Sequence, residues 1–173
     1  MKVFSTGILN GYFDDRFGHR GEQFLKNIKP SRSFQLGWSD LPAGTKTLAV
    51  IFIDYDAIPV CGFPWIHWTV ANIDPALGEL SENASVEKNL LEGVTSWSSP
   101  IIPADFKLSR EDDAGFGGCA PPDKAHEYSV DVYALDTTLN LKRGFYMNDL
   151  LKAMQGHILD KATVVGLYKT KEN

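Results

Sequence analysis

The sequence has few of the features that mark a disulfide-rich, nucleic-acid-binding or membrane protein. It contains only two cysteines in 173 residues and no Cys-x-x-Cys pair, which argues against a disulfide scaffold and against structural zinc. Its net charge is −5 and it has no dense cluster of Lys and Arg, although binding to nucleic-acid phosphates requires such a cluster. It also has no membrane-spanning apolar run and no apolar signal segment at its start. We therefore expect a cytoplasmic protein with no integral membrane segment and no nucleic-acid partner.

The signatures of several large enzyme classes are absent too. The chain has no G-x-S-x-G nucleophile elbow, no H-E-x-x-H metal helix and no Walker loop. A small hydrolase that uses Asp and His for acid–base chemistry is the weaker alternative to a binding protein. Nothing in the sequence indicates a metal or a cofactor.

The chain does contain enough apolar sequence to form a folded core. Hydrophobic residues make up 43% of it, and neither a Gly/Ser linker nor an internal repeat divides it. We expect a single domain over residues 1–173.

Most of the patterned segments predict β-strands. Residues 47–53 form a continuous apolar run rich in β-branched residues, typical of a strand that is covered on both faces. Other strands are predicted by alternating or β-branched sequence at residues 3–8, 33–38, 65–71, 126–135 and 162–168.

Two predicted strands carry histidines near their starts. Alternation of side chains places His67 on the same face as Trp65 and places Trp68 on the opposite, more apolar face. In the other strand His126 and Tyr128 share a face. Each strand thus presents a polar ring close to its end.

Helices are expected to be few and to lie around a largely antiparallel sheet system. Residues 148–159 carry an apolar stripe at helical spacing, and Asn148 is a suitable cap for the start of this helix. A weaker helical or turn segment is expected over residues 83–91. The stripe consists of Leu150, Leu151, Met154 and Ile158.

Three segments at strand ends form a candidate site. The Gly- and Pro-rich residues 115–122 predict a stiff loop with an accessible backbone that leads toward His126. With His67 and a tyrosine hydroxyl, the amides of this loop could hold a phosphate or a carboxylate. Asp54 and Asp56 would repel an anion, so at least one of them should orient a histidine, donate as a neutral acid or receive an ammonium group of the ligand.

A long irregular segment separates the two histidine strands. Residues 92–125 are rich in Ser, Pro, Gly and charge, and long loops in compact domains are often functional. We interpret this segment as a wall of the pocket, with a surface insertion of no ligand role as the alternative for residues 100–113. Cys61 and Cys119 adjoin the candidate elements and are expected to be free thiols, a redox pair being the alternative.

Three motifs together resemble the phosphatidylethanolamine-binding protein family. They are DYDAIP at residues 54–59, WIHW at residues 65–68 and GFGGCAPPDKAHEY at residues 115–128. The bacterial and archaeal Raf-kinase-inhibitor-like branch is the most similar, and the resemblance extends over about residues 31–168. The chain differs from the family pattern at Tyr55 and Cys119, where proline is usual, and at Ala120, which is glycine in some relatives.

The resemblance implies a mainly β, antiparallel, Greek-key, β-sandwich-like fold with a few peripheral helices and an anion pocket near one end. Its implied ligands are a phospholipid head group, phosphoethanolamine or a phosphorylated protein segment, and its implied activities include kinase regulation and protease inhibition. It is also compatible with a homodimer. The ligand-binding residues that it implies, with Asp56 and Pro121 in supporting places, are Asp54, Asp56, Trp65, His67, Ala120, Pro121, Pro122, His126 and Tyr128.

These observations predict a non-enzymatic binding protein for phosphate-bearing or other anionic groups. A protein-interaction module such as a protease inhibitor, in which the pocket is secondary, is the alternative. If imidazolium groups dominate the contact, lower pH should tighten anion binding.

Overall fold

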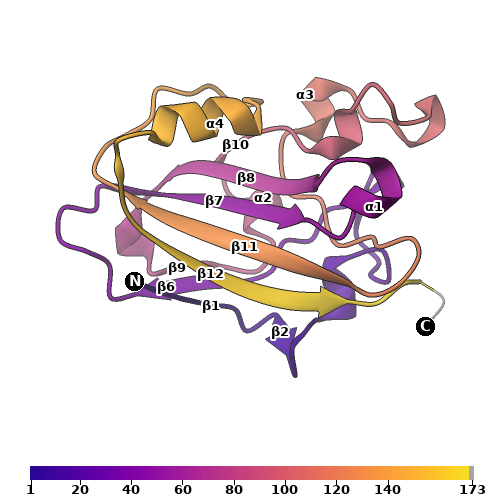
Figure 1. Cartoon of the computed structure of the whole chain (residues 1–173), viewed down its shortest axis with the longest axis horizontal. Helices are drawn as coiled ribbons and strands as arrows, with labels where there is room; N and C mark the ends of the chain where they lie inside the picture. Colours follow the sequence, from indigo (N-terminus) through magenta and orange to yellow (C-terminus); the bar gives the residue numbers. More distant parts are fainter. Residues whose placement is uncertain (172–173) are drawn as a thin grey trace.

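A computed structural model of the chain describes residues 1–171, and strands dominate it (Figure 1). The strands are β1 (Lys2–Phe4), β2 (Ile8–Leu9), β3 (Tyr12–Phe13), β4 (Phe24–Leu25), β5 (Lys29–Pro30), β6 (Leu36–Ser39), β7 (Thr47–Asp54), β8 (Trp65–Ile73), β9 (Glu79–Leu80), β10 (Leu91–Glu92), β11 (His126–Leu135) and β12 (Ile158–Tyr168). The α-helices are α1 (Ile58–Cys61), α2 (Ala84–Glu87), α3 (Arg110–Asp113) and α4 (Met147–Met154). Short 3-10 turns are η1 (Asp15–Phe17), η2 (Pro75–Leu77), η3 (Ser96–Ser98) and η4 (Ala104–Phe106).

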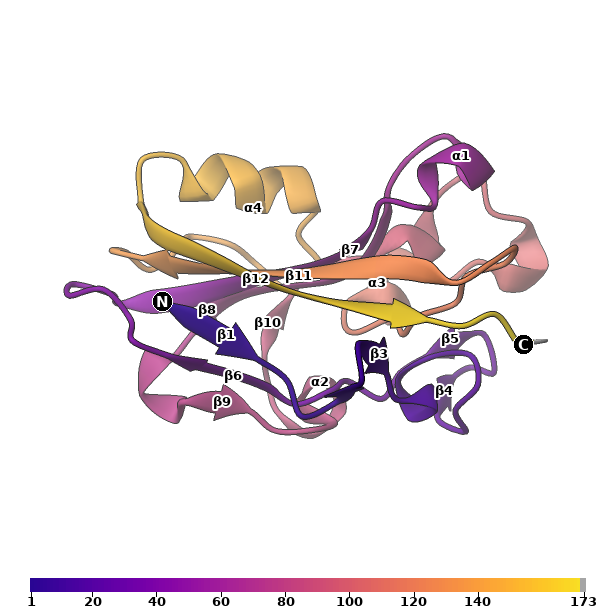
Figure 2. The same cartoon turned by 60° about the horizontal axis from the view of Figure 1, so that its bottom comes forward.

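The strands form two layers, with α4 on the outer side of the larger one (Figure 2). The larger sheet has the order β10-β8-β7-β11-β12-β3-β2, and the smaller one has the order β1-β6-β9. The mainly β, sandwich-like prediction is confirmed. The larger sheet is mixed rather than wholly antiparallel, because β12 pairs in parallel with β3 through Leu167 and Tyr12.

Strand β7 is buried along its whole length, as its continuous apolar sequence predicts. Its alternate side chains enter two separate hydrophobic clusters. Leu48, Val50 and Phe52 pack in the cluster between the two sheets. Ile51 and Ile53 pack in the cluster beneath α4. Because this strand is fixed from both sides, the residues at its carboxyl end are held firmly.

The C-terminal helix is shorter than the hydrophobic spacing predicts. It ends at Met154, and β12 begins at Ile158, which pairs with Leu135 of β11. Pairing along a long neighbouring strand outweighs the local helical pattern here. The helix starts after Tyr146, whose backbone N–H donates to the Asp149 carboxylate, so Asn148 is not the cap. Leu151 is exposed, so it does not belong to the packed stripe.

Two other predicted elements are also shorter than expected. The predicted strand over residues 3–8 is divided into β1 and β2, because the N–H of Ile8 turns back to the carbonyl of Ser5. The segment at residues 83–91 contains only the single helical turn α2 before β10. Among residues 1–171, no helix combines the length and the apolar character needed to cross a membrane.

Candidate functional site

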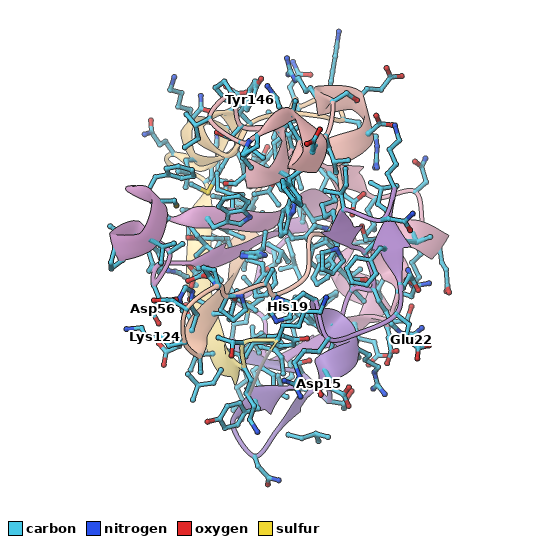
Figure 3. All side chains as sticks on the ribbon, turned by 90° about the vertical axis from the view of Figure 1, so that its right-hand side faces the viewer. Asp15, His19, Glu22, Asp56, Lys124 and Tyr146 are labelled. Atoms are coloured by element: carbon cyan, nitrogen blue, oxygen red, sulfur yellow. The ribbon has the colours of Figure 1, made fainter. Side chains whose placement is uncertain are left out.

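A cavity of about 300 Å³ lies at the end of the sheet where β7 ends and where β8 and β11 begin. This is the end that carries α1 (Figures 1 and 2). Figure 3 views the molecule from this end, with Asp56 and Lys124 labelled at one side. The cavity is lined by Asp54, Ala57, Val60, Cys61, Trp65, His67, Trp97, Ala120, Pro122 and His126.

Asp54 is the last residue of β7 and is only 3% exposed. One of its carboxylate oxygens accepts a hydrogen bond from the N–H of Ala57, at 3.1 Å, which fixes the turn into α1. The other lies 2.7 Å from Nδ1 of His126. Asp54 therefore orients a histidine, which is one of the roles that the sequence suggested for the two aspartates.

His126 lies between two carboxylates and is fully buried. Its Nδ1 is paired with Asp54 and its Nε2 lies 2.8 Å from Oδ1 of Asp123. A neutral imidazole has a single N–H, whereas two carboxylate partners need two donors, so this environment selects the imidazolium form. Burial alone would disfavour the charge, but the hydrogen bonds to Asp54 and Asp123 outweigh it and raise the pKa of His126.

His67 enters the site through a bulge in β8. Ile53 of β7 pairs with Ile66 and Phe52 pairs with Trp68, so His67 is an extra residue between the two pairs. The rings of His67 and Trp68 therefore lie on the same side of the sheet. His67 lies 5.2 Å from the Phe52 ring, and Trp68 packs in the same cluster as Phe52. The prediction that His67 points away from the apolar face of Trp68 is wrong, because strict alternation is broken at the bulge.

The ring of His67 is oriented by two backbone carbonyls. Its Nδ1 lies 2.9 Å from the oxygen of Gly117 and 3.1 Å from that of Gly118. Carbonyls only accept hydrogen bonds, so Nδ1 carries the proton and Nε2 keeps a lone pair. Burial of this ring, which is 2% exposed, lowers the pKa of His67 to about 4. The pKa values of the two pocket histidines are therefore shifted in opposite directions.

The Gly-rich loop acts on the site through its carbonyls, not through the amides that the sequence suggested. The four successive N–H groups of residues 117–120 already donate to other groups: the carbonyls of His67, Pro30 and Phe17 and the hydroxyl of Tyr128. The glycines are needed because the backbone is packed closely. A Cβ at Gly117 would meet the Trp97 ring, and one at Gly118 would meet the Phe17 carbonyl.

The remaining residues of the predicted site lie around the cavity. Asp56 accepts a hydrogen bond from the N–H of Glu127 at 2.9 Å and so connects the turn after β7 to β11. Pro121 is buried next to the cavity. Tyr128 lies in the core, where its hydroxyl accepts the N–H of Ala120 at 3.2 Å, and burial raises its pKa. All three residues support the cavity, but they do not line it.

Sequence reasoning missed several residues of the site. Three of them, Ala57, Val60 and Cys61, lie within five residues after Asp56. Their position in the turn that follows the two aspartates was the signal that could have identified them. Trp97 comes from the long irregular segment that was interpreted as a pocket wall, where no periodic pattern marks a single residue. Asp123 was missed although it lies three residues before His126, because Asp after Pro is usual in turns.

The structure also places the two cysteines and Tyr55, one of the residues at which the chain differs from the family pattern. Tyr55 is 53% exposed and does not line the cavity, although it directly follows Asp54 in the chain. Cys119 is fully buried in the core, and burial raises the pKa of its thiol well above the ordinary value. Cys61 is partly exposed and donates to the carbonyl of Ala57. Both thiols are free in this structure.

Comparison with known proteins identifies the family. The model of the phosphatidylethanolamine-binding protein family matches residues 5–169. The chain belongs to this family. It is 44% identical over 159 residues to YxkA of Bacillus subtilis, a protein described as uncharacterized, with coverage of 90% of this chain and 92% of that protein. It is 34% identical over 144 residues to a UPF0098 protein of Methanothermobacter thermautotrophicus, with coverage of 83% and 84%.

Solved structures of phosphatidylethanolamine-binding protein homologues have the same fold. CT736 of Chlamydia trachomatis superposes with a TM-score of 0.75 at 28% identity, covering 98% of this chain and 97% of that one. YbcL of Escherichia coli, described as a member of the mammalian PEBP family, superposes with a TM-score of 0.74 at 26% identity and covers 98% of both chains. The family resemblance seen in the three motifs is confirmed.

Proposed function

We propose that this protein is a non-enzymatic binding protein whose pocket takes a phosphate-bearing or other anionic group. The observation that carries the proposal is the buried His126 imidazolium at the wall of the cavity. A cation with N–H donors in a dry site binds oxyanions strongly, because charge-assisted hydrogen bonds are little weakened by solvent. The family name, phosphatidylethanolamine-binding protein, supports a phospholipid head group or phosphoethanolamine as the ligand. A phosphorylated protein segment carries the same phosphate group and is the other ligand that we propose.

The other groups of the pocket suit such a ligand. Nε2 of His67 can accept the proton of a singly protonated phosphate. The Nε2–H of His126, which is paired with Asp123 in this structure, can donate to an unprotonated oxygen that takes the place of that carboxylate. The indole N–H of Trp65 is buried and has no partner within residues 1–171, so it is a further donor. Val60 and Trp97 offer apolar contact to the carbon part of a phosphate ester.

Anion binding should depend on pH through one histidine, not two. The pKa of His67, about 4, keeps this ring neutral from pH 5 to pH 8. The pKa of His126 is raised, so its charge is full in mildly acid solution and is lost as the pH rises through that value. We expect affinity for phosphate to fall as the pH increases through the titration of His126. An affinity that rises with pH would contradict the imidazolium contact.

The test compares His126→Asn with the wild type. The Asn side-chain nitrogen can replace Nδ1 as a donor to Asp54, while the Nε2 donor and the positive charge are lost. The matched control is His157→Asn, an exposed histidine that pairs with Asp136 at the opposite end of β11 and β12. Titration with phosphate, phosphoethanolamine and a phosphopeptide, followed by calorimetry, should show saturable binding in the wild type and control. We expect at least about tenfold weaker binding in a folded His126→Asn protein. Equal binding by all three proteins would contradict the proposal.

A protein-interaction role, as a kinase regulator or protease inhibitor, is the second candidate. It is favoured by exposed apolar side chains next to the cavity, Tyr55, Ile58 and Val60, which adjoin the turn that lines it. This role predicts tight binding to a protein and little affinity for small anions. A hydrolase, the third candidate, predicts turnover that is lost in His67→Asn and His126→Asn. Cytoplasmic localisation and a homodimer remain predictions, which cell fractionation and analytical ultracentrifugation respectively can check.

A further inference from the structure

The outer nitrogen of His126 is already paired with a carboxylate of the same chain. Its inner nitrogen faces Asp54, which is 3% exposed and is also held by the N–H of Ala57. Its outer nitrogen faces Asp123, whose side chain is 51% exposed. A ligand can therefore reach this ring by displacing Asp123, whereas displacing Asp54 would break the turn after β7.

Asp123 is free to move without disturbing the core. It lies in a bend between β11 and the buried Pro121, and residues 122–125 are all exposed. Within residues 1–171, His126 is the one side chain that pairs with the Asp123 carboxylate, which also accepts from the backbone N–H groups of Asp123 and Lys124. Rotation of this side chain toward solvent breaks the pair with His126 and these local backbone contacts, but it disturbs no packing of the core, and water can hydrate the released carboxylate.

Displacement by a simple anion is unfavourable, for two reasons. The anion must compete with an internal carboxylate whose effective concentration is high, because only two residues separate Asp123 from His126. After displacement, the Asp123 carboxylate has no partner and stays close to the new negative charge. A ligand that also carries a cation removes the second cost, because the released carboxylate can pair with that cation.

We propose that Asp123 is a specificity-determining residue that makes the pocket prefer zwitterionic phosphate esters to purely anionic ones. When the ligand binds, the His126 imidazolium stops pairing with Asp123 and pairs with the phosphate. The Asp123 carboxylate then pairs with the ammonium group of the ligand. A simple anion replaces one charge pair by one and leaves the Asp123 carboxylate unpaired, whereas a zwitterion gives two charge pairs in place of one. This inference rests on the proposed function.

The decisive experiment uses two phosphate esters of equal size. Phosphoethanolamine carries an ammonium group where propyl phosphate carries a methyl group. We expect the wild type to bind phosphoethanolamine about 3- to 5-fold more tightly, the range of a partly exposed ion pair. In Asp123→Asn the preference should fall to near 1, and propyl phosphate should bind more tightly than to the wild type.

The control is Glu127→Gln, which removes an equal charge from an exposed residue next to His126. Within residues 1–171 the Glu127 side chain makes no hydrogen bond or ion pair, so this variant should keep the wild-type preference. The assays belong at a pH of about 6, because removing a carboxylate lowers the pKa of His126 and the ring must be charged in every variant. The charged and titratable groups facing this ring are Asp54 from β7, His67 from β8, Tyr128 from β11 and Asp123 itself.

The possible outcomes separate the two proposals. If the wild type binds both esters equally, or if Asp123→Asn keeps the preference, the role of Asp123 is overturned and the anion pocket stands. If neither the wild type nor any variant binds either ester, the proposed function is overturned together with this inference. Side-chain ¹⁵N NMR of the free wild type is an independent check, in which His126 should show protons on both ring nitrogens. A neutral His126 at pH 6 would also overturn the exchange.

Discussion

The two pocket histidines are given different protonation states by the atoms that contact them. His67 meets two carbonyl oxygens and, within residues 1–171, no carboxylate at hydrogen-bond distance, so burial dominates and the ring stays neutral. His126 meets two carboxylates, so it holds a proton in spite of burial. The same residue type thus supplies one lone pair and one cation to the same cavity.

At the residue scale we predict that His67 destabilises the protein in acid. Between pH 6.5 and pH 4 the unfolded chain binds a proton at this ring while the folded chain does not, so the free energy of unfolding falls as the pH is lowered. The shift corresponds to about 3 kcal/mol at most. His126 has the opposite sign, since its raised pKa contributes stability that is fully present below about pH 6.5 and is lost as the pH rises through the folded value.

Urea unfolding of His67→Asn at pH 7 and pH 4.5 tests this prediction. The Asn side chain can still donate to the carbonyls of Gly117 and Gly118, but it does not titrate. Its free energy of unfolding should depend on pH less steeply than that of the wild type, whereas His157→Asn should behave like the wild type. The same pH dependence in all three proteins would show that His67 is not the group responsible.

Irregular elements place most of the cavity wall, and each is held by a specific contact. The bulge in β8 brings His67 onto the core side of the sheet. The segment between β10 and β11 is fastened by a buried ion pair, in which Nζ of Lys29 lies 3.1 Å from Oδ1 of Asp113 and donates to the backbone oxygen of Asp113 at 2.7 Å. The N–H of Thr95 also donates to Asp113. Thr95, which belongs to this anchor, lies two residues before Trp97, which lines the cavity.

At the element scale we predict that Asp113→Ala is strongly destabilising. It leaves the Lys29 ammonium buried without its carboxylate, which costs about 3–5 kcal/mol. Asp112→Ala is the matched control, because its partner Lys26 is exposed and such pairs contribute about 1 kcal/mol or less. The double variant Lys29→Met/Asp113→Ala should recover part of the loss. Chemical unfolding measures all three, and equal effects of the two single substitutions would contradict the role of the buried pair.

In the whole molecule, the N-terminal segment and the last strand meet next to the Gly-rich loop. The hydroxyl of Tyr168 donates to the carbonyl of Asp15 at 2.7 Å and accepts the N–H of Arg20 at 3.0 Å. The N–H of His19 donates to the carbonyl of Cys119 at 2.8 Å. The pocket end is therefore built from segments that lie throughout the chain, and we expect it to form only when the whole chain is folded.

At this scale we predict that the chain unfolds as one cooperative unit. Tyr168→Phe should therefore lower the free energy of unfolding of the whole domain. Removing the hydroxyl takes one partner from each of two backbone groups, at a cost of about 1–3 kcal/mol. Tyr12→Phe is the control, since this ring is partly exposed and should change stability by less than about 0.5 kcal/mol. Thermal unfolding followed by fluorescence and by circular dichroism should give coincident single transitions. Two separated transitions would contradict the single-domain prediction.

The sequence by itself determined the long strands and the family. The apolar run of β7 needs burial on both faces wherever it lies, and the alternation in β11 holds without interruption from His126 to Val132. The three motifs at strand ends were sufficient to identify relatives. Patterns of this kind depend on near neighbours in the chain, so they can be read without a structure.

Only the tertiary structure decided the chemistry of the pocket. The bulge at His67, the end of α4 at Met154 and the contact of Trp97 with the cavity all depend on pairing or packing between distant segments. The charges of the two histidines depend on burial and on the identity of each partner atom, which belong to other strands and loops. For that reason the residue types were predictable, whereas their protonation and the pairing of Asp123 with His126 were not.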